Sequence, residues 1–130
     1  MHREPDLAIL LDLDPYAPRA ARHHVGHVDH PSPDLRDVVM LLTSEIVSRA
    51  VERAEGETIE MRVWMPHDVV RIEMRGSRAA IAPTAEDDHG FGLMLVEEIA
   101  DRWDVENSGG PACIWFEIDR HPASVAAVRS

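Results

Sequence analysis

The hydrophobic and polar residues of this chain repeat with two different periods. Apolar residues recur at helical spacing most clearly over 33–54, and Gly56 follows this segment as a C-cap. Weaker patterns of the same kind predict helices over 18–29 and 93–103. We therefore expect three helices, of which the second is the longest.

The second period is two residues, as in a strand with one buried face. Alternating or continuous apolar runs, bounded by proline and glycine, predict strands over 7–14, 58–65, 69–75, 103–106 and 112–119. Short turns join the second strand to the third and the fourth to the fifth, so both pairs are expected to form hairpins. The segment 77–89 has no sustained period and is expected to be a loop.

This order of elements predicts an α+β fold. We expect a two-layer sandwich in which three helices cover one face of a mixed, mostly antiparallel sheet. One domain is expected over residues 1–119, followed by a flexible tail at 120–130.

Composition and charge narrow the classes of function. The chain has 13 arginines, no lysine and 24 acidic residues, so its net charge is −11. Nucleic-acid binding is disfavoured because phosphate contacts need clustered cations, and a P-loop is excluded because its motif requires lysine. An acidic surface favours a basic protein partner. A single cysteine, Cys113, and the lack of a signal peptide or membrane span in the sequence predict a cytoplasmic protein.

Three segments carry motifs that resemble a known family when they are taken together. They are Leu-Leu-Thr-Ser-Glu-Ile-Val-Ser-Arg-Ala-Val at 41–51, Gly-Ser at 76–77 and Gly-Phe-Gly-Leu-Met-Leu-Val at 90–96. In this order they resemble the N, G1 and G2 boxes of the GHKL (histidine kinase-like) ATPases, specifically the anti-sigma-factor serine kinases. The stretches at 100–103 and 114–117 add to the resemblance, which covers about residues 7–119.

The resemblance implies roles for two residues of the long helix. In the family, the helix glutamate is the general base toward a serine of the antagonist protein, and Glu45 matches it. An asparagine one turn later holds magnesium, and here Arg49 occupies that position. Because Mg²⁺ requires oxygen ligands and a guanidinium offers only donors and positive charge, we predict no metal at Arg49.

The resemblance also implies a set of nucleotide-binding residues, of which this chain has only some. Gly76 stands where the family has the aspartate that binds adenine, and Cys113 stands where it has a threonine near the same base. A hydrogen bond to a charged group contributes about 1.5–3 kcal/mol, so its loss should weaken affinity by about one to two decades. Gly90, Gly92 and Leu93 match the phosphate-binding box, whose backbone amides suit an anion. We therefore expect ATP to bind weakly and without firmly held Mg²⁺.

Some of these residues, and a group of histidines, can also be interpreted without the resemblance to the family. Glu45 and Arg49 are spaced i, i+4 with the acid first, which favours a helical ion pair, and Arg49 could also imitate the metal's charge toward a phosphate. Four histidines lie close together, and we expect them to be solvated, since no cysteine or carboxylate pattern accompanies them: His23, His24, His27 and His30.

The leading functional hypothesis is a regulatory protein, an anti-sigma-type pseudokinase that binds a sigma factor or a STAS-domain anti-anti-sigma protein. The enzyme alternative is an active ATP-dependent serine kinase that phosphorylates a STAS protein, favoured by Glu45 and the box at 90–96. A third alternative is a structural or dimerising relic, since relatives often form homodimers. Replacing Arg49→Asn and Gly76→Asp together is expected to restore part of the nucleotide binding.

Overall fold

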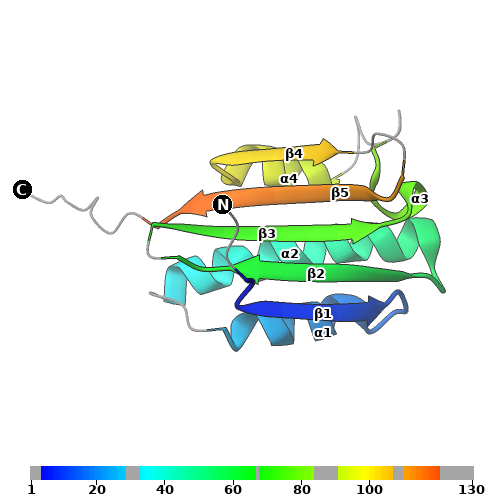
Figure 1. Ribbon diagram of the computed structural model, residues 1–130, viewed down its shortest axis with the longest axis horizontal. Helices are drawn as coiled ribbons and strands as arrows, with labels where there is room; N and C mark the ends of the chain where they lie inside the picture. The colour runs from blue at the N-terminus through cyan, green and yellow to red at the C-terminus, as the bar shows by residue number, and fades with distance from the viewer. Residues whose placement is uncertain (1–3, 29–32, 67, 84–90, 107–109, 121–130) are drawn as a thin grey trace, which may run out of the picture.

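The computed structural model describes residues 4–28, 33–66, 68–83, 91–106 and 110–120. Five strands form one sheet in the order β1-β2-β3-β5-β4, and every pairing is antiparallel (Figure 1). The elements along the chain are β1 (Leu7–Asp12), α1 (Ala17–Gly26), α2 (Pro33–Ala54), β2 (Thr58–Trp64), β3 (Val69–Gly76), α3 (Arg78–Ile81), α4 (Phe91–Ile99), β4 (Arg102–Glu106) and β5 (Ala112–Asp119).

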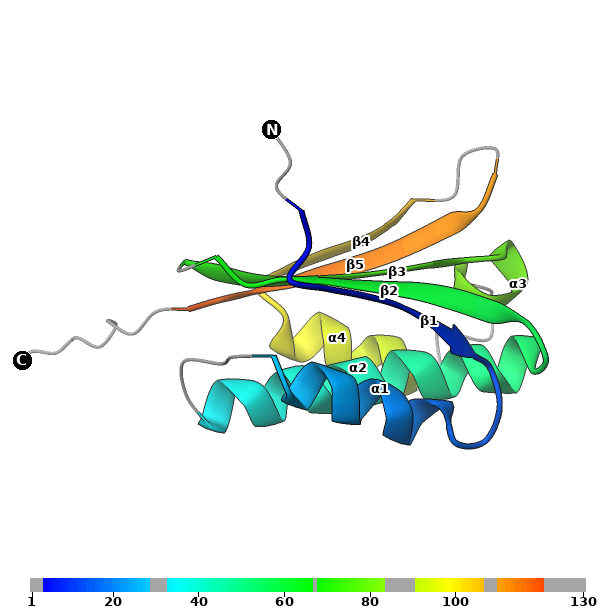
Figure 2. The same ribbon diagram turned by 60° about the horizontal axis from the view of Figure 1, so that its bottom comes forward.

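The predicted two-layer α+β fold is confirmed. Figure 2 shows α1, α2 and α4 on one side of the sheet, and no helix of the described residues covers the other side. The bounds of α2 are those predicted, and each strand begins and ends within two residues of its expected position. The sheet is antiparallel throughout the described strands, where a mixed sheet was expected, because each strand pairs with a neighbour that runs the opposite way.

The segment expected to be a loop between β3 and α4 contains a helix. Residues 78–81 form α3, with Ser77 in extended conformation as its N-cap. The pattern did not predict this helix because four residues are too few to show a helical period. Residues 84–89 of that segment lie outside the described residues, as do the tail residues 121–130.

The long helix α2 ends just before a glycine in left-handed conformation. Gly56 has a φ of +97°, in the left-handed region that glycine enters without a Cβ clash. Its N–H donates to the carbonyl of Leu13 at 2.9 Å, which ties the end of α2 to the chain after β1. The predicted C-cap at Gly56 is therefore confirmed.

The sheet separates the molecule into a helix-packed face and an open face. Strand side chains alternate, and those facing the helices form the core, in which Met61, Met74 and Ile114 share one row across three strands. Phe116 is the largest fully buried side chain. The other set of side chains is mostly charged, as expected for an antiparallel sheet with one solvated face. None of the described helices combines the length and apolar character needed to cross a membrane.

Candidate functional site

Arg49 lies on the buried side of α2 and is only 8% exposed. Its guanidinium donates hydrogen bonds to the backbone carbonyls of Ile81, at 2.9 Å, and Ala82, at 3.0 Å. These carbonyls lie at the end of α3, where helical carbonyls lack partners within the helix and carry partial negative charge. The planar donors of a guanidinium suit two adjacent acceptors. Arg49 therefore caps α3, a contact that the sequence pattern did not predict.

Helix α3 is also held by other side chains around it. The Ser77 hydroxyl accepts a hydrogen bond from the Ala80 N–H at 3.1 Å and donates one to the Glu57 carboxylate at 2.6 Å. From α2, the Arg53 Nε donates to the Ala79 carbonyl at 3.1 Å. A helix this short does not persist by its own hydrogen bonds, so these contacts and its buried residues hold it in place.

Gly76 ends β3 in a space too small for any side chain. A Cβ at this position would lie 2.7 Å from Cγ2 of Ile59 and 3.5 Å from Cγ1 of Ile81. Both isoleucines are fully buried, and a close-packed core leaves no room for them to give way without strain. The position that the resemblance assigns to the adenine acceptor is thus surrounded by Ile59 and α3.

The positions assigned to the metal ligand and to the adenine acceptor meet at the same short helix. Arg49 binds the carbonyl of Ile81, and Gly76 faces the side chain of the same residue. Glu45, the candidate base, lies one helical turn before Arg49 on α2 and is half-buried. The structure therefore brings Arg49 and Gly76 together through α3.

The candidate phosphate-binding residues are only partly described. Gly90 lies outside the described residues. Gly92 lies in the first turn of α4, which begins at Phe91, two residues earlier than expected. Leu93 is buried in the core, so any contact between this residue and an anion would come from its backbone.

Cys113 lies on the opposite side of the sheet from Arg49. Its neighbours across the strands are Arg75 and Glu106, both on the open face, while Ala112 is the residue that pairs with Gly76 on the helix side. The thiol is buried, and this burial raises its pKa, so that it stays protonated at neutral pH. Cys113 is therefore not brought together with Arg49 and Gly76, because neighbouring residues of a strand face opposite ways.

The described histidines lie in the last turns of α1 and at its C-cap, where the ring of His23 lies close to those of His24 and His27. The rings of His23 and His27 have centroids 4.3 Å apart, and Nδ1 of His27 lies 2.8 Å from the carbonyl oxygen of His23. His30 lies outside the described residues. Within the described part of the chain, no three histidine, cysteine or acidic side chains group as metal ligands do.

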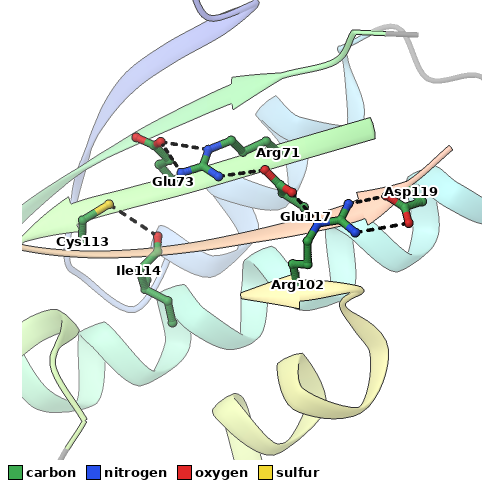
Figure 3. Close-up of polar contacts among 7 residues, drawn as sticks. All are labelled: Arg71, Glu73, Arg102, Cys113, Ile114, Glu117 and Asp119. Atoms are coloured by element: carbon green, nitrogen blue, oxygen red, sulfur yellow. Dashed lines mark hydrogen bonds and ion pairs between the residues drawn. The ribbon is translucent and has the colours of Figure 1, made fainter. Parts of the chain in front are cut away.

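The open face carries an ion-pair network that we did not anticipate from the sequence (Figure 3). Arg71 bonds Glu73 at 2.9 Å and Glu117 at 2.8 Å, and its guanidinium stacks 4.3 Å above the Trp115 ring. On the other side of Glu117, Arg102 donates to its carboxylate at 2.7 Å and also pairs with Asp119. The sequence does show charged residues at alternate positions of these strands, which is typical of a solvated face. Which charges pair depends on strand register, which the sequence pattern does not give.

Comparison with known proteins identified no relative of this chain. No family model matches it, and no curated protein matches it.

The cap on α3 can be tested by removing its charge. We expect Arg49→Met to lower the free energy of unfolding by about 2–3 kcal/mol, because the buried carbonyls of Ile81 and Ala82 lose their donor. The matched control is Arg53→Met, which removes the hydrogen bond from the half-buried Arg53 to the Ala79 carbonyl and should cost about 1 kcal/mol or less. Urea unfolding followed by circular dichroism measures both. Equal losses would contradict the role of Arg49 as the principal cap.

The network around Glu117 should make stability depend on pH. Burial raises the pKa of Glu117, but hydrogen bonds from Arg102 and Arg71 outweigh this effect and hold the pKa below 4.5. Such a carboxylate stabilises the fold above its unfolded-state pKa, and this contribution is lost as pH falls through the folded-state value.

We therefore expect Glu117→Gln to lower stability at about pH 7 and to differ much less from the native chain at about pH 3. Urea unfolding at both pH values measures this difference. The control is Glu98→Gln, which removes one carboxylate from the exposed side of α4. If Glu117→Gln lowers the free energy of unfolding equally at both pH values, the charge of the carboxylate does not cause the loss.

Proposed function

We propose that this chain is a regulatory protein of the anti-sigma type that binds a sigma factor or a STAS-domain anti-anti-sigma protein without turning over ATP. The motifs at 41–51 and 90–96 support the choice of partners by resemblance. The loss of catalysis rests on one observation, the bonding of Arg49 to the carbonyls of Ile81 and Ala82.

The residues present do not fit a complex of ATP with Mg²⁺. A guanidinium stands at the family's metal-ligand position, and its positive charge repels a divalent cation. Two of its donors are already engaged by α3, so Arg49 is poorly placed to imitate the metal toward a phosphate. The candidate base Glu45 would then have no phosphoryl donor to act with.

Displacing α3 to admit a nucleotide would be costly. It would break two hydrogen bonds from a charged group, each contributing about 1.5–3 kcal/mol. It would also expose the buried Ile81, at about 1.5–3 kcal/mol. A net cost of even about 4 kcal/mol leaves the open form at about one molecule in a thousand and weakens apparent affinity by the same factor.

Calorimetric titration with ATP, with and without Mg²⁺, tests the blocked site directly. We expect a dissociation constant weaker than about 1 mM in both cases. The double change Arg49→Asn and Gly76→Asp should not restore binding, in contrast to the expectation from motifs alone, because the new side chain would collide with Ile59. Micromolar, Mg²⁺-dependent binding by the native chain would overturn the proposal.

Partner binding tests the regulatory half of the proposal. Purified sigma factors and STAS-domain proteins from the same genome should include one that binds the chain equally well with and without ATP. Mass spectrometry of the STAS protein after incubation with ATP and Mg²⁺ should show no added phosphate.

Two variants on α2 separate the regulator from the kinase alternative. If a STAS serine is phosphorylated, and Glu45→Gln abolishes this while the exposed Glu52→Gln does not, the chain is an active kinase and the proposal fails. If no sigma factor or STAS protein binds, the regulatory assignment fails instead.

A further inference from the structure

A cavity of about 610 Å³ lies at one end of the sheet, where the open faces of β1, β2 and β3 approach the residues that precede β5. Leu10, Glu60 and Arg75 line it and are direct neighbours across those three strands. The other lining residues are Thr58, Ile59, Gly76, Ser77, Arg78, Gly110 and Pro111. The row Leu10, Glu60 and Arg75 points away from the helices. Arg78 is the first residue of α3, so the cavity adjoins the start of this helix, whereas Arg49 binds carbonyls at its end.

Two arginines of this cavity are available to a ligand. Arg75 and Arg78 are exposed, and among the described residues neither guanidinium has a hydrogen bond or ion pair. The nearby carboxylate of Glu60 is already bound by Arg62 at 3.0 Å. By contrast, Arg71 is fully engaged with acids of the same face. Among the described residues, the cavity therefore carries two arginines without an ion pair, in a protein whose net charge is −11.

The same cavity has an exposed apolar side. Leu10 is 74% exposed, the highest value among the large hydrophobic side chains of the described residues. Pro111, which lines the cavity just before β5, is also exposed. Exposed apolar groups beside unpaired cations are typical of a binding surface rather than of a solvated face.

We propose that this cavity binds an acidic segment of a partner protein, with its carboxylates on Arg75 and Arg78 and an apolar side chain against Leu10. Guanidinium groups bind carboxylates through paired, charge-assisted hydrogen bonds. Most of the lining is exposed, so the hollow accommodates a segment of chain lying across it rather than an enclosed small molecule. Glu60 also lines the cavity, and its carboxylate is held by Arg62. Acids farther away repel such a segment only weakly, because salt screens charges beyond about 8 Å at physiological ionic strength.

The inference rests on the proposed protein-binding function, since it names the surface that such a regulator would present. The two can fail separately. Tight ATP binding by a native chain that also binds the acidic peptide would overturn only the proposed function. A native chain that binds a purified sigma factor or STAS protein but no acidic peptide would overturn only the cavity.

Fluorescence anisotropy with a labelled peptide, Asp-Glu-Leu-Asp-Glu-Leu-Asp-Glu, tests the cavity. We expect the native chain to bind it, and the double change Arg75→Gln and Arg78→Gln to weaken binding at least about tenfold. Leu10→Ser should weaken it severalfold. The matched control is Arg19→Gln with Arg22→Gln on α1, which removes the same charge from exposed positions outside the cavity and should leave affinity unchanged.

Several results would overturn the proposal. The first is no binding of the peptide by the native chain, and the second is an equal loss in the α1 control, which would indicate a general charge effect. A third is equal binding of a peptide with lysine in place of each acid. Displacement of the peptide by millimolar inorganic phosphate would identify a simple anion site instead. Unfolding midpoints of the variants, expected to be native-like because the changed residues are exposed, show that each one is folded.

Discussion

The guanidinium of Arg49, bound to the carbonyls of Ile81 and Ala82, organises the end of the molecule at which α2, β3 and α3 meet. A buried charge is tolerated only when its donors are satisfied, because desolvation penalises an unpaired ion by several kcal/mol. Here the acceptors come from a helix too short to persist alone. The charge and the helix therefore stabilise each other, and neither is favourable in that place without its partner.

This mutual dependence extends into the sheet. Because α3 carries Ile81 into the core, the last residue of β3 has almost no space on its helix-facing side. Gly76 fits there because it has no side chain. The resemblance implies that the residue at position 49 would hold magnesium and the residue at position 76 would bind adenine. In this chain both contact the same four-residue helix. Two departures from the family's motif thus correspond to a single packing arrangement.

The arginines near the open face of the sheet differ in whether acids of the same face bind them. On the open face, Arg71 and Arg102 share Glu117, so that charges of opposite sign neutralise one another (Figure 3). At the end of the same face, Arg75 and Arg78 have no such partner among the described residues. An acidic protein can therefore carry a local cationic site, since short-range pairing, and not net charge, decides which groups remain available.

Local periodicity was sufficient to predict α2, the strands and the layered α+β fold, because helical and strand periods belong to short stretches of sequence. The motif pattern likewise singled out Arg49 and Gly76. Contacts distant in sequence decided the rest. Helix α3 exists through bonds from a residue 32 positions away, and no local pattern could indicate it. The side of the sheet on which Cys113 lies, and the ion pairs around Glu117, follow from strand register, in which a shift of one residue reverses every side chain.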